Sequence, residues 1–297
     1  MTETSGPKAG TARALVVGAG PAGLMAAEEL ARAGLSVTVA DAMPSAGRKL
    51  LMAGKSGLNL TKVEDPAAFR AAYGTMPPQL GAALDGFGPE AAMAWAEGLG
   101  QPLFTGSTGR VFPVAMKASP LLRAWLARLA GLGVTLRTRR RWTGWDGTAP
   151  TFDTPGGARS EVPDVLILAL GGASWRRLGS DGQWAGLLAP HVAPFQPANT
   201  GLTVDWSAHM TPHLGTPLKG IALRAGRLAS RGEIVVSAKG IEGGGLYPLT
   251  PALRDGAPLT LDLAPDLSLE EVARRLDATP RKASWPNRLR RALGFDP

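Results

Sequence analysis

The sequence contains no cysteine among its 297 residues. This absence excludes a redox-active disulfide, an iron–sulfur cluster, a thiol nucleophile and a cofactor attached through a cysteine side chain. Any electron transfer must therefore proceed through a bound organic cofactor.

Histidine is almost as scarce, with three residues, His191, His209 and His213. His209 and His213 have the spacing of two metal ligands on one helix, but Pro212 between them argues against a helix. The sequence offers no third ligand at a suitable distance from this pair. A metal site is therefore not expected.

Long hydrophobic runs are missing too. Apolar residues make up 44% of the chain, the mean hydropathy is +0.02, and no run approaches the length that spans a bilayer. Residues 1–10 are polar and lack the apolar centre of a signal peptide, so we predict a disordered lead-in over residues 1–12. These features predict a soluble protein of the cytoplasm with no membrane partner.

The most informative stretch runs from Ala14 to Asp41. An apolar run, Ala14–Val17, is followed at once by a glycine-rich turn, Gly18–Gly23. Apolar residues then recur at helical spacing from Leu24 to Ala31, and a second apolar run, Ser36–Ala40, ends at Asp41. This order of strand, glycine turn, helix, strand and acid is typical of a dinucleotide-binding βαβ unit.

Each residue of the turn has a physical role in such a unit. Gly18 permits the tight turn, Gly20 lets the backbone approach a pyrophosphate, and Gly23 allows close packing of helix on sheet. Pro21 suits the first helical turn, where an N–H has no intrahelical partner. Asp41 lies 23 positions after Gly18, close to the spacing that places an acid on a ribose hydroxyl.

The loop after Asp41 indicates which dinucleotide is bound. It contains Gly47-Arg48-Lys49 and then Gly57-Leu58-Asn59-Leu60-Thr61. A βαβ unit followed by this loop resembles the two-dinucleotide-binding-domain flavoproteins. The longer string is similar to the BaiN/YhiN-type flavoproteins, a bacterial family of NAD(P)/FAD-dependent oxidoreductases. The resemblance implies bound FAD, with NAD(P)H as a transient reductant and an unknown small organic molecule as acceptor.

A second match to this family lies far along the chain. Asp164–Leu170 is an apolar run, which predicts a central strand buried on both faces, and Gly171-Gly172 follows it. The resemblance places both glycines close to the cofactor. The full set of expected cofactor-binding residues is Gly18, Gly20, Pro21, Ala22, Gly23, Asp41, Gly47, Arg48, Lys49, Asn59, Leu60, Thr61, Gly171 and Gly172. No catalytic acid or base stands out.

Other residues are candidates for the flavin or substrate side. Arg110 and Lys117 could contact FAD phosphates or a carboxylated substrate, and surface charge is an equally good explanation of both. In the family, a glycine loop matching Gly243-Gly244 lies on the flavin side of a substrate domain. Glu242 and Tyr247 are the possible polar contacts there.

The remaining pattern predicts an α/β fold with two domains. Residues 13–192 are expected to form an FAD-binding Rossmann-type parallel sheet with a β-meander, and a helix capped by Ser119 precedes its third strand. Residues 193–297 contain short alternating runs between turns, which indicate an inserted β-rich substrate domain with C-terminal helices. Ser268-Leu269-Glu270-Glu271 has the pattern of a capping box and predicts the start of one of these helices. Family members continue for about another hundred residues, by the resemblance, so we expect this domain to be truncated and FAD retention to be weakened.

The net charge is +8 and the isoelectric point is near 10.3. The densest cluster, Arg137–Arg141 beside Trp142, is interpreted as a solvated strand edge, and a nucleic-acid partner is not expected. Two alternatives to the oxidoreductase stay open. One is an RNA-acting flavoprotein, favoured by the isoelectric point, and the other is an inactive, truncated nucleotide-binding remnant. The sequence does not define the oligomeric state.

Overall fold

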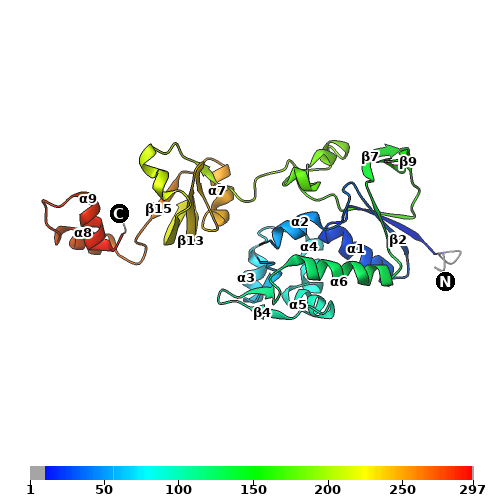
Figure 1. Ribbon diagram of the computed structural model, residues 1–297, viewed down its shortest axis with the longest axis horizontal. Helices are drawn as coiled ribbons and strands as arrows, with labels where there is room; N and C mark the ends of the chain where they lie inside the picture. Colours follow the sequence, from blue (N-terminus) through cyan, green and yellow to red (C-terminus); the bar gives the residue numbers. More distant parts are fainter. Residues whose placement is uncertain (1–10, 56, 296–297) are drawn as a thin grey trace. The chain divides into compact units, whose positions relative to one another are not determined.

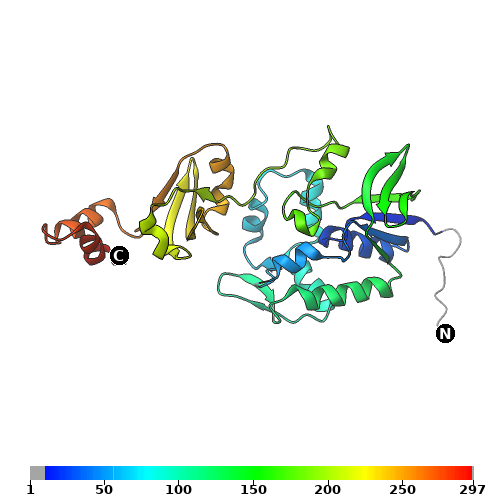
Figure 2. The same ribbon diagram turned by 45° about the horizontal axis from the view of Figure 1, so that its top comes forward.

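The computed structural model describes residues 11–55 and 57–295. The chain divides into two compact units, with the boundary between Phe195 and Gln196 (Figures 1 and 2). The boundary expected from the sequence, between residues 192 and 193, lies three residues earlier. The expected lead-in, residues 1–12, lies outside the described residues except for its last two.

A parallel sheet forms the centre of the first unit. Its strand order is β10-β1-β2-β6, and all three pairings are parallel. The elements are β1 (Arg13–Val17), α1 (Pro21–Arg32), β2 (Ser36–Asp41), β6 (Thr135–Thr138) and β10 (Val165–Leu168). The Rossmann-type parallel sheet expected from the glycine turn is thus confirmed.

The position of β10 differs from the prediction. β10 pairs with β1 alone and lies at the edge of the described sheet, whereas its apolar sequence predicted a central strand. Val165 and Ile167 contact one apolar cluster and Leu166 and Leu168 contact another, so both faces of the strand are covered. Apolar residues on both sides of a strand indicate that both of its faces are buried. They do not indicate whether it has a hydrogen-bonded neighbour on each edge.

Side chains of the sheet alternate between two apolar clusters. On one face, Val16 and Val39 pack against α1 and the long helix α6 (Ala118–Gly131). On the other face, Leu15 and Val17 pack against the antiparallel meander, and Figure 1 shows the helices and the meander on opposite sides of the sheet. The meander consists of β7 (Arg141–Asp146), β8 (Ala149–Thr154) and β9 (Gly157–Ser160), as the sequence predicted.

Four shorter helices and a small antiparallel sheet complete the main part of the first unit. The helices are α2 (Arg48–Ala53), α3 (Pro66–Ala71), α4 (Pro78–Gly86) and α5 (Pro89–Gly98), and the sheet has the order β3-β5-β4, with β3 (Thr61–Lys62), β4 (Leu103–Thr105) and β5 (Arg110–Pro113). α6 is capped by Lys117 and not by Ser119. Lys117 is the last extended residue, and Pro120 fits the first turn of α6 because that position requires no N–H donor.

Glu28 of α1 joins three helices inside the first unit. Its carboxylate is buried and accepts hydrogen bonds from the indole Nε1 of Trp125 at 2.7 Å, from Arg32 at 2.7 Å and from Arg128 at 3.1 Å. The indole of Trp95 on α5 lies 3.5 Å from the same carboxylate. Burial raises the pKa of Glu28, but the hydrogen bonds from the two arginines and two indoles outweigh it, so the pKa lies below its ordinary value.

The second unit begins with a five-stranded antiparallel sheet of order β11-β14-β13-β12-β15. Its elements are β11 (Leu202–Thr203), η3 (Ala208–His213), β12 (Pro217–Ala225), β13 (Leu228–Ser237), β14 (Gly240–Glu242), η4 (Tyr247–Leu249), α7 (Thr250–Arg254) and β15 (Leu259–Asp262). Ile221, Leu223, Ile234, Leu246 and Leu249 form its apolar core. The short alternating runs of the sequence therefore do form strands.

Two helices end the described chain, α8 (Leu269–Asp277) and α9 (Trp285–Leu293). The hydroxyl of Ser268 accepts a hydrogen bond from the backbone N–H of Glu271 at 3.2 Å, which is the helix start that the sequence predicted. Glu271 then pairs with Arg274 and Arg275.

Candidate functional site

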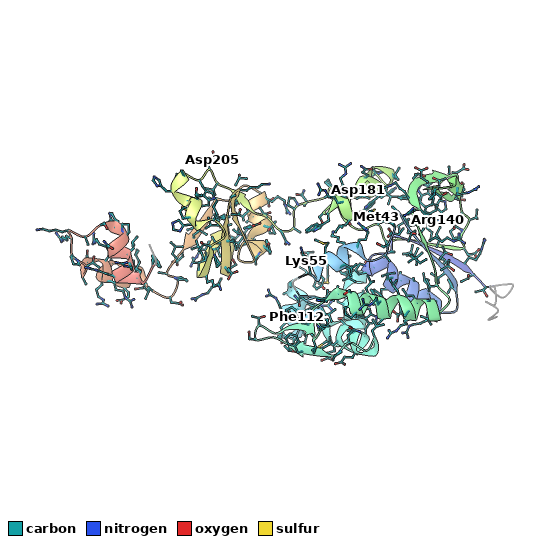
Figure 3. The ribbon with its side chains drawn as sticks, in the orientation of Figure 1. Met43, Lys55, Phe112, Arg140, Asp181 and Asp205 are labelled. Atoms are coloured by element: carbon teal, nitrogen blue, oxygen red, sulfur yellow. The ribbon has the colours of Figure 1, made fainter. Side chains whose placement is uncertain are left out.

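A pocket of about 360 Å³ lies where three strands of the parallel sheet end. Val17 ends β1, Asp41 ends β2, and Ala169 and Leu170 follow β10, and all four line the pocket. Met43, Arg140 and Asp181, which also line it, gather in the same region of Figure 3. A crevice at the carboxyl ends of parallel strands is the usual place for a ligand in this class of sheet.

The glycine turn forms the floor of this pocket. Gly18 has φ +107°, and its N–H donates to the carbonyl O of Ala40 at 2.7 Å. A Cβ on Gly18 would overlap the carbonyl O of Ala169, and a Cβ on Gly23 would overlap the carbonyl O of Gly18. A Cβ on Gly20 would meet no protein atom within 4 Å. Gly18 and Gly23 are thus required by close backbone packing, whereas Gly20 borders open space that a ligand can occupy.

The N-terminus of α1 opens onto this space. Gly20 is its cap residue, no side chain caps the helix, and the first turn holds no acidic residue. Pro21 stands at the start of the helix, where its missing N–H costs nothing. The N–H groups of this turn and the positive end of the helix dipole are therefore available to an anion.

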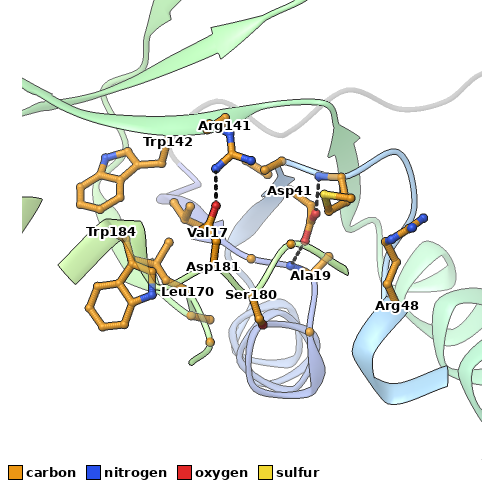
Figure 4. A pocket seen from close by; sticks show the side chains of 18 of the residues that line it. Val17, Ala19, Asp41, Arg48, Arg141, Trp142, Leu170, Ser180, Asp181 and Trp184 are labelled. Atoms are coloured by element: carbon orange, nitrogen blue, oxygen red, sulfur yellow. Dashed lines mark hydrogen bonds and ion pairs between the residues drawn. The ribbon is translucent and has the colours of Figure 1, made fainter. Parts of the chain in front are cut away.

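Asp41 connects the end of β2 to the glycine turn. One carboxylate oxygen accepts the backbone N–H of Ala19 at 2.6 Å, and the other accepts the N–H of Met43 at 2.7 Å (Figure 4). Each carboxylate oxygen has a second lone pair, so Asp41 can accept further hydrogen bonds from ligand hydroxyl groups. Its position is fixed before any ligand arrives.

Arg48 and Lys49 supply positive charge on the α2 side of the pocket. The ammonium group of Lys49 donates to the hydroxyl of Ser174 at 2.7 Å, which connects α2 to the loop after β10. The Nε of Arg48 is buried and, among the described residues, has no hydrogen-bond partner. Its Nη1 lies 3.5 Å from the hydroxyl of Ser45, a long contact, and a cationic side chain beside an open helix N-terminus suits a phosphate ligand.

The opposite wall is aromatic and was missed by the sequence interpretation. Trp142 of β7 and Trp184 of η2 (Gln183–Leu187) line it, and Figure 4 shows Asp41 between these two rings and Arg48. Arg141 pairs with Asp181 at 3.4 Å beside them. Arg137, Arg139 and Arg141 of the predicted solvated edge are exposed, and β6 is an edge strand of the described sheet, so only Trp142 beside them is buried. Alternation along β7 turns Trp142 inward, a signal that the run of arginines obscured.

The structure separates the predicted residues into three groups. Those that line the pocket are Gly18, Gly20, Asp41, Gly47, Arg48, Lys49 and Gly171, whereas Pro21, Ala22 and Gly23 lie behind them in the first turn of α1 and Gly172 follows Gly171. Asn59, Leu60 and Thr61 lie outside the pocket lining, where Thr61 pairs with Val111, the neighbour of Arg110 on β5, and the N–H of Leu60 donates to the carbonyl O of Val111. Glu242, Gly243, Gly244 and Tyr247 belong to the second unit, and Lys117 is exposed at the start of α6.

Within residues 11–55 and 57–295, no three histidine or carboxylate side chains are grouped so that they could hold a metal ion. The helices found there are all too short or too polar to cross a bilayer.

A parallel sheet with an open helix N-terminus, a close-packed glycine turn and an acid at the end of β2 defines a Rossmann-type nucleotide-binding protein. Residues 12–205 match the HI0933-like protein Rossmann domain, and residues 196–293 match the HI0933-like protein barrel and H2TH domain. The chain belongs to the HI0933-like family. This membership agrees with the family resemblance found in the sequence.

Three solved structures are similar to this chain at low sequence identity and low TM-score. A 3-ketosteroid-Δ4-(5α)-dehydrogenase from Rhodococcus jostii RHA1 is 16% identical, with a TM-score of 0.41, over 55% of this chain and 46% of its own. The open conformation of a flavocytochrome c3 fumarate reductase is 22% identical, with a TM-score of 0.37, over 55% and 34%. The p-nitrophenol 4-monooxygenase PnpA from Pseudomonas putida DLL-E4 is 16% identical, with a TM-score of 0.35, over 97% and 65%.

The chain thus spans between 34% and 65% of the length of these three proteins. No curated protein matches the chain.

Proposed function

We propose that the pocket binds FAD and that the protein is an FAD-dependent oxidoreductase. In this proposal NAD(P)H reduces the flavin and a small organic molecule accepts the electrons, with a cytoplasmic site of action. The observation that carries the proposal is the open space at Gly20, beside the uncapped N-terminus of α1 and the carboxylate of Asp41.

The groups along the pocket fit the parts of a dinucleotide. The helix N-terminus, Arg48 and Lys49 can neutralise a pyrophosphate, and Asp41 can accept ribose hydroxyl groups. Trp142 and Trp184 provide an aromatic wall on the side of Asp41 away from Arg48. The pocket has four cationic side chains and two carboxylates, so it is suited to an anionic ligand.

Once bound, FAD supplies the hydride and electron chemistry. The chain's own residues bind the adenine nucleotide half, orient it through Asp41, and hold the loop after β10 in place through Lys49 and Ser174. The pocket lining contains no histidine that could move a proton. This fits a reaction in which geometry matters more than a titrating side chain.

The direct test is a titration of the purified protein with FAD, followed by visible absorbance and by quenching of tryptophan fluorescence. We expect a bound, yellow flavin that is bleached by NADH or NADPH in the absence of oxygen. A folded protein that gains no flavin signal would overturn the proposal. Bound FAD that neither nucleotide reduces would overturn the NAD(P)H step and favour the nucleotide-binding remnant.

A matched pair of variants locates the site. Gly20→Val fills the space at the N-terminus of α1 and should abolish FAD binding while the protein stays folded. Gly131→Val adds the same side chain at the end of α6, where no protein atom lies within 4 Å either, and should leave binding unchanged. Equal FAD affinity in the two variants would place the cofactor elsewhere.

A further inference from the structure

The last part of the described chain carries an unusual charge distribution. Between Ala278 and Phe295 there are five cationic side chains and no carboxylate. The cations are Arg281, Lys282, Arg288, Arg290 and Arg291. They lie on α9 and on the segment that leads into it, so the positive charge is concentrated in one short stretch.

The neighbouring helix α8 neutralises its own charge. Glu271 accepts hydrogen bonds from Arg274 at 2.7 Å and from Arg275 at 2.6 Å. In the part of the chain that the structure describes, the five cations of residues 278–295 have no ion-pair partner. Four of them, Arg281, Lys282, Arg290 and Arg291, are exposed. The carboxylates that flank this stretch in the sequence are Asp277, exposed at the end of α8, and Asp296, which lies outside the described residues.

An aromatic side chain lies within the same surface. Trp285 begins α9 and is 61% exposed, which is unusual for so large an apolar side chain. The guanidinium carbon of Arg288 lies 4.7 Å from the centre of its ring. Arg288 is itself held by Thr279, whose hydroxyl accepts at 2.8 Å, and by the carbonyl O of Leu276 at 3.0 Å. The ring is thus supported on one side by a fixed cation.

The apolar residues of α9 are not available to a membrane. Ala292 is buried and Leu289 and Leu293 are half-buried, while α8 and α9 pack against each other. A helix that lies in a membrane surface needs an exposed apolar face, and α9 exposes Trp285 among arginines instead. Dispersed cations beside an exposed ring are the combination that binds single-stranded nucleic acid, by phosphate contacts and base stacking.

We propose that α9 and the segment from Arg281 to Ser284 bind single-stranded nucleic acid. Arg290 and Arg291 contact phosphates, and the ring of Trp285 stacks on a base. This binding site goes beyond the proposed function and does not depend on a bound flavin.

The experiment measures fluorescence anisotropy of labelled oligouridine and oligothymidine, each about 20 nucleotides long, with the full chain at salt concentrations from about 50 mM upward. We expect binding that weakens as salt rises. Arg290→Glu/Arg291→Glu should lower the affinity at least about tenfold and reduce the slope of log affinity against log salt by about 1.4, for two lost phosphate contacts. Trp285→Ala should lower the affinity about tenfold with the salt slope unchanged.

Arg224→Glu/Arg227→Glu is the matched control. It changes the net charge equally, at exposed arginines on β12 and in the turn after it. The control should weaken binding by less than about threefold. Circular dichroism establishes that each variant is folded. The proposal is overturned if the wild type binds neither oligonucleotide, if the control loses as much affinity as the α9 variant, or if only vesicles of anionic lipid are bound.

Discussion

Helices α1 and α8 differ in how the free N–H groups of their first turn are satisfied. Both begin with backbone N–H groups that have no partner inside the helix. At α8 the chain satisfies them itself, with Ser268 as cap and Glu270 and Glu271 in the first turn. At α1 there is no side-chain cap and no acid, and the end faces a pocket. A helix start that its own sequence leaves open is a better guide to a binding site than one that is filled.

The two helices differ equally in how they use a glutamate. Glu28 of α1 is 1% exposed and is surrounded by donors from α1, α5 and α6. Glu271 of α8 is partly exposed and bonds to two arginines of its own helix. The first holds helices together, and the second stabilises one helix at the surface.

Among the variants considered, Glu28→Ala is expected to lower the free energy of unfolding the most. It would leave Arg128 and the indole of Trp125 without their acceptor in the protein interior, where breaking such a network costs about 3–5 kcal/mol. Urea unfolding followed by tryptophan fluorescence measures the loss. Glu271→Ala is the control and should cost far less stability than Glu28→Ala, because its ion pairs face solvent. Similar losses of stability in both variants would contradict the prediction that the buried carboxylate contributes more than the solvent-facing one.

The next effect concerns the open end of α1. Gly20→Ala places a methyl group in the pocket and should weaken FAD binding by about tenfold, with unchanged stability, because the added Cβ meets no protein atom. Gly23→Ala should instead destabilise the first unit, because its Cβ would overlap the backbone of Gly18. Isothermal titration and thermal unfolding separate the two outcomes. A stable Gly23→Ala variant would contradict the close packing of α1 on the turn.

The contributions of Glu28 and Glu271 to stability should both be lost at low pH. The pKa of Glu28 is lowered by folding, so its contribution to stability is complete above the unfolded pKa near 4.5 and is lost as the pH falls through the folded pKa. The pKa of Glu271 is lowered to about 2, mainly by its hydrogen bonds to Arg274 and Arg275, and its contribution is lost in the window from about 4.5 to 2. Unfolding measured from pH 6 to pH 2 should be less acid-sensitive in Glu28→Gln than in the wild type.

The smallest effect is expected at the cap of α8. Ser268→Ala removes the acceptor for the N–H of Glu271 and should cost about 1 kcal/mol of local stability. Hydrogen exchange of the first-turn amides of α8 measures this loss. Ser268→Asn restores an acceptor and should recover most of it. Unchanged exchange in Ser268→Ala would mean that the cap contributes nothing.

The features that the sequence predicted correctly are local. The βαβ unit from Ala14 to Asp41 is encoded by residues that are neighbours along the chain, and the cap of α8 is encoded within the four residues Ser268–Glu271. The edge position of β10 was missed, because pairing between distant strands leaves no trace in the composition of one of them. Arg141 and Asp181 are forty residues apart, so no local pattern could predict their ion pair in the pocket wall.

The two backbone amides that donate to Asp41 offer a way to detect a ligand in the pocket. The amide protons of Ala19 and Met43 both point at this carboxylate, from the two segments that a ligand must touch. Their exchange with solvent depends on how often the turn and the end of β2 separate. A nucleotide held between those segments would oppose that separation, so slower exchange at these two amides would register binding without any label or colour.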